Sequence, residues 1–115
     1  MRLADVEFDS RGIDVIARVS GEIDLSNAND LESALIGAMS NHSRALIVDL
    51  SHVQYLDSAG IQLIYRLRES LRARRQRLAV VIPNRSPAPE ALRLAGVAEH
   101  VETIETLDDA VHALE

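Results

Sequence analysis

Apolar residues change their spacing several times along the chain, and each spacing predicts a different element. Every second residue from Ile13 to Val19 is apolar among mostly polar neighbours, which predicts a half-buried strand. Residues 3–8 can pair with this strand across a turn at residues 10–12. From Ala28 to Ala38 the apolar residues recur at helical spacing behind Ser26, a favourable residue for the N-cap of a helix.

Two short, uninterrupted apolar runs follow, at residues 45–48 and 78–82. Such runs are typical of interior strands that are covered on both faces. The clearest helical pattern lies between them, because one face carries glycine and aliphatic side chains while arginine and glutamate point elsewhere. That face consists of Gly60, Ile64, Leu67 and Leu71, with Leu63 beside them.

The last part of the chain predicts two more helices and a short strand. Ser86 followed by Pro87 suits the start of a helix, and Gly96 suits its end. Residues 101–104 form a candidate strand, and residues 106–114 form a final helix. Two strands followed by alternating helices and strands predict a layered α/β domain, in which about four helices pack on a mixed sheet with a parallel interior.

Composition narrows the class of protein. At 115 residues, the chain is expected to form one domain, residues 1–115, around a single core. It contains no cysteine, which excludes disulfides, thiolate metal sites and thiol nucleophiles. The N-terminus has no apolar segment of the kind found in secretion signals, and no apolar run reaches membrane-spanning length, so we expect a cytoplasmic protein without membrane contact.

Charge is distributed unevenly along the chain. The formal net charge is −6, which argues against nucleic acid as the main partner. All 12 basic residues are arginine, and half of them lie between Arg66 and Arg77. Positive charge is favourable at the C-terminal end of a helix, and no aromatic residue that could stack on bases lies among these arginines. We therefore interpret this run as the solvated end of a helix.

The most informative stretch for function is residues 48–61. A buried strand is expected to end there, followed by a short connection and by a helix that begins at Asp57 and Ser58. Sites in α/β proteins favour this carboxyl end of the strands. We expect Ser58 at or next to the N-cap with an exposed hydroxyl, and Gly60 on the inner face, where it lets the helix approach the sheet. The alternative is that Ser58 only caps the helix.

Five segments, in this order and with suitable spacing, carry a resemblance: Gly21–Leu25, Val48–Ser51, Asp57–Ile61, Leu78–Ile82 and Leu94–Val97. Together they resemble the bacterial anti-sigma factor antagonists, which are the stand-alone members of the STAS (sulphate transporter and anti-sigma factor antagonist) domain family. The resemblance covers nearly the whole chain, and it implies a STAS-like fold.

The resemblance also implies a function in transcription regulation. Family members bind an anti-sigma factor that is also a serine kinase, and this binding frees the sigma factor. The kinase phosphorylates the serine of an Asp-Ser-x-Gly motif, here Ser58, and the antagonist is released until a serine phosphatase resets it. By the same match, Asp24 lies in the loop that faces Ser58, and Asp57 flanks it. Ala59 replaces the second serine of the commonest motif, which leaves one acceptor.

Partner contacts are expected around this serine. The helical projection turns Ile61, Gln62 and Tyr65 away from the buried face, so they can form a docking patch within about two turns of Ser58. Packing under a neighbouring loop is the alternative for Ile61 and Tyr65. The full set of expected partner-binding residues is Asp24, Asp57, Ala59, Gly60, Ile61, Gln62 and Tyr65.

Other functions match the sequence less well. A serine hydrolase would need Ser58 beside a histidine, but the motif lacks the glycine before serine of a Gly-x-Ser-x-Gly turn. A receiver-like Mg²⁺ site at Asp24, Asp49 and Asp57 would need a lysine, and the chain has none. We expect no enzyme activity, no cofactor and no metal. The alternative within the fold is a scaffold or a nucleotide-binding module without a serine switch.

Overall fold

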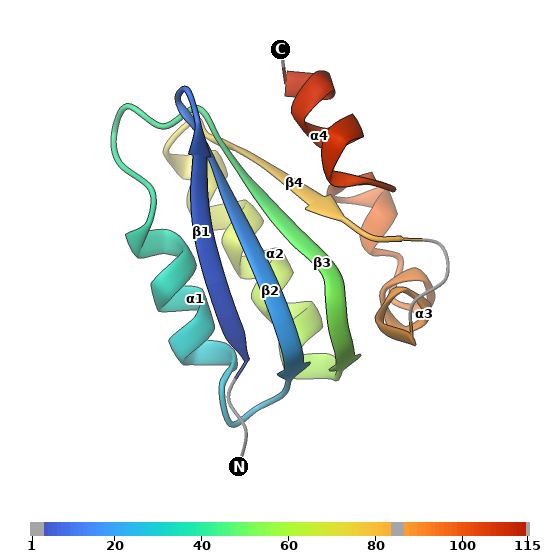
Figure 1. Ribbon diagram of the computed structural model, residues 1–115. Coiled ribbons are helices and arrows are strands. Elements are labelled where there is room, and N and C mark those ends of the chain that lie inside the picture. The colour runs from blue at the N-terminus through green and yellow to red at the C-terminus, as the bar shows by residue number, and fades with distance from the viewer. Residues whose placement is uncertain (1–3, 84–86, 115) are drawn as a thin grey trace.

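In the computed structural model, which describes residues 4–83 and 87–114, a five-stranded sheet forms the centre of the molecule (Figure 1). Strands β1 (Asp5–Arg11) and β2 (Asp14–Ile23) form an antiparallel hairpin. Strands β3 (Ala45–Leu56), β4 (Arg77–Val81) and β5 (Glu102–Ile104) follow in parallel, each paired with the one before. The predicted mixed sheet with a parallel interior is confirmed.

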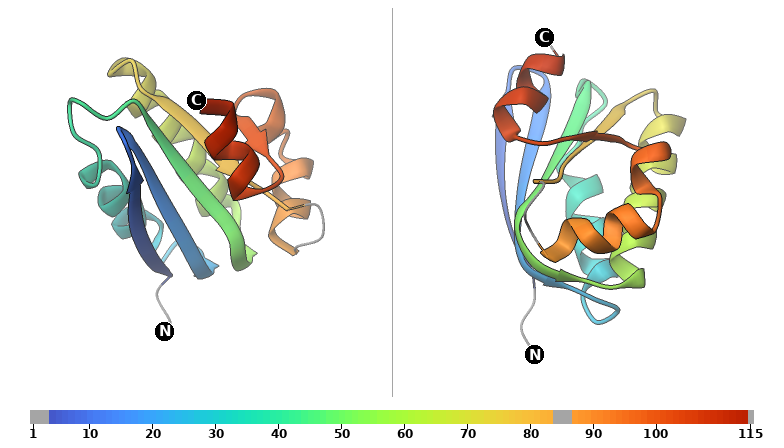
Figure 2. Two further views of the ribbon diagram at one scale, coloured as in Figure 1. Left: turned by 45° about the horizontal axis from the view of Figure 1, so that its top comes forward. Right: turned by 90° about the vertical axis from the view of Figure 1, so that its right-hand side faces the viewer.

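Helices cover the two faces of the sheet unequally. Helices α1 (Ala28–Gly37), α2 (Ser58–Ala73) and α3 (Pro87–Leu94) lie on one face, and the short 3-10 helix η1 (Val97–Glu99) follows α3. Helix α4 (Leu107–Leu114) packs against the opposite face, as Figure 2 shows. Among the described residues, no helix combines the length and apolar character needed to cross a membrane. The layered α/β architecture expected from the sequence is confirmed.

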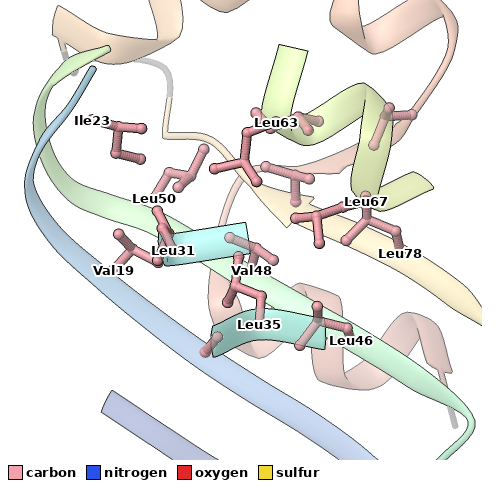
Figure 3. Close-up of a cluster of buried hydrophobic side chains, with 14 of the residues drawn as sticks. Val19, Ile23, Leu31, Leu35, Leu46, Val48, Leu50, Leu63, Leu67 and Leu78 are labelled. Carbon is pink, nitrogen blue, oxygen red and sulfur yellow. The ribbon is translucent and has the colours of Figure 1, made fainter. Parts of the chain in front are cut away.

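The larger core lies between the sheet and helices α1 and α2. Leu31 and Leu35 of α1, and Leu63 and Leu67 of α2, point toward aliphatic side chains of β2 and β3 (Figure 3). The whole predicted inner face of α2 is buried. Each fully buried leucine contributes about 1.5–3 kcal/mol through the apolar surface that it removes from water. This core therefore fixes the position of α2 and of its first turn.

Strand β3 runs further than the sequence pattern predicts. It continues to Leu56, so Asp57 alone separates it from α2, and the prediction of a connection between the strand and the helix within residues 48–61 is wrong. The pairing register with β2 shifts at two places along β3, and Ser51 donates its backbone N–H to Asp49 near the first of them. Such irregularities bend a strand and break the alternation of buried and exposed residues. The polar second half of β3 therefore does not resemble a strand in sequence.

Two predictions for single residues are also wrong. Ile13 lies in the turn between β1 and β2 with 55% of its surface exposed, because the hairpin ends at the pair Arg11 and Asp14. The N-cap of α1 is Asn27 and not Ser26, because Ser26 donates both its N–H and its hydroxyl to Asp24.

The structure confirms most of the elements predicted for the last part of the chain. Gly96 follows the end of α3 in the left-handed conformation with φ 71°, as its predicted role requires. The short strand and the final helix are present as β5 and α4. The predicted cap Ser86 lies outside the described residues.

Candidate functional site

Two loops meet at the carboxyl ends of β2 and β3. Ile23 is paired with Leu56 at the end of the two strands, and the backbone N–H of Asp57 donates to the carbonyl oxygen of Ile23 at 3.2 Å. The loop at residues 24–27 leaves β2 at this point, and α2 begins one residue after β3 ends. The structure thus brings the Asp24 loop and the Asp-Ser-Ala-Gly segment to the same edge of the sheet, as expected.

The start of α2 separates the capping residue from the candidate phosphoacceptor. Asp57 is the N-cap, and its Oδ1 accepts hydrogen bonds from the backbone N–H groups of Ala59 at 2.8 Å and Gly60 at 3.4 Å. Ser58 is the first helical residue and is exposed. Within the described residues its hydroxyl has no hydrogen-bond partner. Because Asp57 supplies the cap, the alternative that Ser58 serves only to cap the helix is excluded.

Asp24 organises the loop that faces this helix end. Its Oδ1 accepts from both the N–H and the hydroxyl of Ser26, and its own N–H donates to Oδ1 of Asn27 at 3.0 Å. Asn27 in turn donates its side-chain amide to the carbonyl oxygen of Glu22 at 2.8 Å. The hydrogen bonds from Ser26 stabilise the carboxylate and hold the pKa of Asp24 below its ordinary value. Asp24 therefore carries its negative charge at neutral pH.

Gly60 permits the close approach of α2 to the sheet. A Cβ atom at this position would lie 2.6 Å from Cγ of Leu56 and 3.1 Å from Cγ2 of Ile23. Real Cβ atoms do not make contacts as short as the first of these. The role expected for Gly60 is confirmed, and it explains why this helix starts directly above the end of β3.

The residues expected at the partner surface divide into two groups. Gln62 is exposed, whereas Ala59, Ile61 and Tyr65 are half-buried and pack against the core. Gly60 is buried and does not belong to the surface, so its expected place among the partner contacts is wrong. The Tyr65 hydroxyl donates to the carbonyl oxygen of Ala95 at 3.4 Å. The Tyr65 ring also meets the ring of His100 edge-on, with the centroids 5.9 Å apart. Tyr65 thus packs under the segment after α3, which was the alternative considered for it, and it is less accessible than a free surface residue.

Two exposed apolar residues near Ser58 are absent from the set expected from sequence. Leu25, in the loop after β2, has 80% of its surface exposed, and Tyr55, at the end of β3, has 51% exposed. Among the described residues they belong to a group of four exposed large hydrophobic residues, with Phe8 and Ile13. The sequence does contain one signal for the exposure of Leu25. This leucine lies between Asp24 and Ser26 and fits neither the helical nor the strand pattern of buried residues.

Histidines and carboxylates near Ser58 bear on the hydrolase and Mg²⁺ alternatives. No histidine is hydrogen-bonded to the Ser58 hydroxyl within residues 4–83 and 87–114. Among the described residues, no group of three or more histidine, aspartate or glutamate side chains could hold a metal ion. Asp49, one of the three carboxylates considered for Mg²⁺, is buried and accepts hydrogen bonds from Ser51 instead.

Solved structures share this architecture. A crystal structure of an anti-sigma factor antagonist from Mycobacterium paratuberculosis matches with a TM-score of 0.84 and 28% identity, over 96% of this chain and 92% of that chain. The Bacillus cell fate determinant SpoIIAA, in its phosphorylated form, matches in fold with a TM-score of 0.68 and 18% identity, over 96% of this chain and 100% of that chain.

Sequence comparison gives the same result. The STAS domain family matches residues 5–110. The anti-sigma-F factor antagonist RsfB of Mycobacterium tuberculosis is 30% identical over 103 residues, which cover 90% of this chain and 82% of RsfB. Nearly the whole chain, including the end of the sheet that carries Ser58, lies within these matches. The chain therefore belongs to the STAS domain family and, within it, to the anti-sigma factor antagonists.

Proposed function

We propose that this protein binds a kinase-type anti-sigma factor in the cytoplasm, frees a sigma factor by doing so, and is released when the kinase phosphorylates Ser58. A serine phosphatase then restores the binding form. The observation that carries the proposal is the state of Ser58, whose exposed hydroxyl has no partner in the described chain while Asp57 caps the helix. A kinase can therefore phosphorylate this hydroxyl without breaking a hydrogen bond that stabilises the fold.

The fold is expected to tolerate the phosphate. Phosphorylation adds about −1.5 to −2 units of charge at one point of the surface. The N-terminus of α2 favours an anion through its dipole, by up to about 2 kcal/mol in a favourable geometry. The modification is therefore a local change of charge and size, and we expect no rearrangement of the sheet or of α2.

The phosphate is expected to affect the binding of a partner much more than the stability of the fold. Asp24 and Asp57 already place negative charge at this edge, and a partner would have to bury the phosphate beside them without a matching cation. Such burial costs several kcal/mol, and each ~1.4 kcal/mol is a factor of ten in affinity. We expect phosphorylation to weaken the complex by at least about a hundredfold.

The surface around Ser58 has the composition of a protein-binding patch. Leu25 and Tyr55 are the exposed apolar residues that flank the site, and Gln62 is exposed on the second turn of α2. Tyrosine is enriched among residues that dominate binding energy, and exposed apolar surface rimmed by polar residues marks interaction sites. We assign the anti-sigma factor contact to this patch, with Ile61 at its edge.

Two properties of similar proteins support the proposal. RsfB is described as an antagonist of an anti-sigma factor, and SpoIIAA has been observed in a phosphorylated form. The present chain has both the fold and the acceptor serine that such a form requires. The absence of a second serine after Ser58 means that modification of this motif is expected at one position.

The proposal is tested with purified candidate anti-sigma factors of the kinase type and ATP. We expect mass spectrometry to find one phosphate, on Ser58, and none on the Ser58→Ala variant. In a binding assay, Ser58→Asp should weaken the complex, whereas Ser10→Asp, at the exposed opposite end of the sheet, should leave it unchanged. Undiminished binding by Ser58→Asp together with no phosphate on Ser58 would instead support a scaffold or nucleotide-binding module without a switch.

A further inference from the structure

The end of α2 that lies farthest from Ser58 carries a concentration of positive charge. Six arginines and one acidic residue, Glu69, fall within residues 66–77, which leaves 17 of the 18 acidic residues for the rest of the chain. We propose that this end of α2 is a second docking site, which takes an acidic segment of a partner protein independently of the Ser58 switch. We call it the arginine surface and define it as Arg68, Arg72, Arg74, Arg75 and Arg77.

A groove runs through the arginine surface. It has a volume of about 180 Å³ and lies between the C-terminal half of α2 and the starts of β4 and β5. Arg68 and Arg72, one helical turn apart on α2, line it together with Arg77 of β4 and His100. Glu102 is the acidic residue that lines the groove. The groove therefore offers several guanidinium groups to one ligand.

The ion pairs at this surface leave much of the positive charge available. Arg68 pairs with Glu69 at 2.7 Å, and Arg77 pairs with Glu102 at 2.7 Å, and both pairs are partly exposed. Exposed pairs of this kind are weak and can exchange with carboxylates of a ligand. Arg72, Arg74 and Arg75 are exposed and have no ion-pair partner within the described residues. A single helix end needs no more than one or two cations to offset its dipole.

Arg75 provides a second, independent observation. It is the one non-glycine residue with positive φ among the described residues, at 58°. The N–H of Gln76 donates to the carbonyl oxygen of Leu71 at 2.8 Å, and the N–H of Arg75 donates to that of Arg72 at 3.0 Å, which together form a Schellman motif at the helix end. Glycine is the favoured residue at the position of Arg75, because a side chain is strained there. The chain thus keeps a guanidinium at a position where glycine would stabilise the fold.

An acidic protein segment fits this surface better than a nucleic acid. The remaining chain has 17 acidic residues against six arginines, so the field around the groove repels a long polyanion. The groove has no phenylalanine, tyrosine or tryptophan in its lining on which bases could stack. A small phosphate compound is also disfavoured, because Arg74 and Arg75 lie beyond the groove lining and their charge matches an extended ligand.

The position of the arginine surface allows it to act while the other end of α2 is occupied. Helix α2 has 16 residues, and its start and end lie at opposite ends of the sheet (Figure 1). At 1.5 Å per residue, the separation along the helix is about 24 Å. A partner bound around Ser58 and a segment bound at the arginine surface therefore do not compete for the same residues.

The proposal is tested with the full chain and a short oligoglutamate peptide as the probe. Backbone amide shifts in NMR titrations should concentrate at the C-terminal half of α2 and the start of β4, and the affinity should fall with added salt. The double variant Arg72→Gln/Arg74→Gln should weaken binding by about tenfold, since each exposed ion pair is worth about two- to fivefold in affinity. Arg93→Gln, which removes an exposed arginine of α3, is the matched control and should bind like the original chain.

The Arg75→Gly variant separates a functional arginine from a structural one. We expect its Tm to rise, because glycine relieves the strained backbone, while its affinity for oligoglutamate falls by about two- to fivefold. A higher Tm with unchanged affinity would overturn the proposal. Changes in amide chemical shift that are spread evenly over all arginines would also overturn it. The same holds if a single-stranded oligouridylate or inorganic pyrophosphate binds more tightly than oligoglutamate at equal charge concentration.

Discussion

The N–H of Asp57 donates to the carbonyl oxygen of Ile23, and this bond ties the start of α2 to the end of β2. The bond links two segments that are far apart in the sequence. It sets the capping carboxylate of Asp57 at the helix start, and it leaves Ser58 facing solvent. Asp57 therefore holds the helix start in place, while the neighbouring Ser58 is accessible from solvent.

This division predicts opposite results for two neighbouring substitutions. Asp57→Ala removes the N-cap of α2 and should lower the free energy of unfolding by about 1 kcal/mol. Ser58→Ala removes a hydroxyl without a partner in the described chain and should change it by less than about 0.5 kcal/mol. Urea denaturation of both variants, with Asp57→Asn as a variant that retains a capping oxygen, is the measurement. A larger loss for Ser58→Ala than for Asp57→Ala would show that the cap is misassigned.

The two helical glycines should respond differently to alanine. At Gly60 the new Cβ would meet Leu56 at 2.6 Å, so Gly60→Ala should lower the free energy of unfolding by about 1–3 kcal/mol. At Gly37, at the end of α1, nothing lies within 4 Å of a Cβ, so Gly37→Ala should be neutral or stabilising by up to about 1 kcal/mol. Thermal unfolding of the two variants gives the comparison, and equal Tm values would contradict the close approach of α2 to the sheet.

The lowered pKa of Asp24 predicts how the stability of the fold changes with pH. The hydrogen bonds from Ser26 favour its carboxylate, so the pKa in the folded protein lies below that in the unfolded chain. The resulting stabilisation is present above the unfolded pKa and is lost as the pH falls through the lowered folded pKa. Carboxyl-detected NMR titration should report the lowered pKa, and Ser26→Ala should move it back toward its ordinary value. An unchanged pKa in Ser26→Ala would assign the shift to another cause.

The apolar patch next to Ser58 is expected to matter for binding and not for folding. Leu25→Ser and Tyr55→Ser should each weaken the complex with an anti-sigma factor by about 1–2 kcal/mol, which is roughly a five- to thirtyfold loss of affinity. Both side chains are mostly exposed, so the free energy of unfolding should change by less than about 0.5 kcal/mol. Isothermal titration calorimetry provides the affinities.

Ile13→Ser is the control for this pair of variants. Ile13 is exposed to a similar degree as Tyr55, but it lies in the hairpin turn at the other end of the sheet. Its replacement should leave the affinity unchanged. A loss of affinity in Ile13→Ser equal to that in Tyr55→Ser would place the interface elsewhere.

Regular periodicity made part of the fold predictable. The inner face of α2 repeats every three or four residues, and all of its members are buried as expected. The apolar run at the start of β3 likewise indicates an interior strand, since both of its faces are covered. These elements follow from local pattern because the burial of each residue depends on its own helix or strand.

Contacts between distant segments made the rest unpredictable. The second half of β3 is paired with β2, and its Val53 and Leu56 are buried in the core, although Ser51, His52 and Gln54 interrupt the apolar pattern. Tyr65 is half-buried because Ala95 and His100 approach it from another part of the chain. For the candidate site, the sequence motif located Ser58 and its neighbours, whereas Leu25 and Tyr55 emerged only when the ends of two strands were placed together.

The separation of Asp57 from Ser58 has a consequence for how such a protein can evolve. A single codon change that removes the acceptor hydroxyl leaves the helix start intact. Under the proposed function, the product would be a correctly folded antagonist that the kinase could not release, so regulation could be lost in one step and regained in one step without passing through an unstable intermediate. Selection on signalling and selection on folding therefore act on different codons of the same motif.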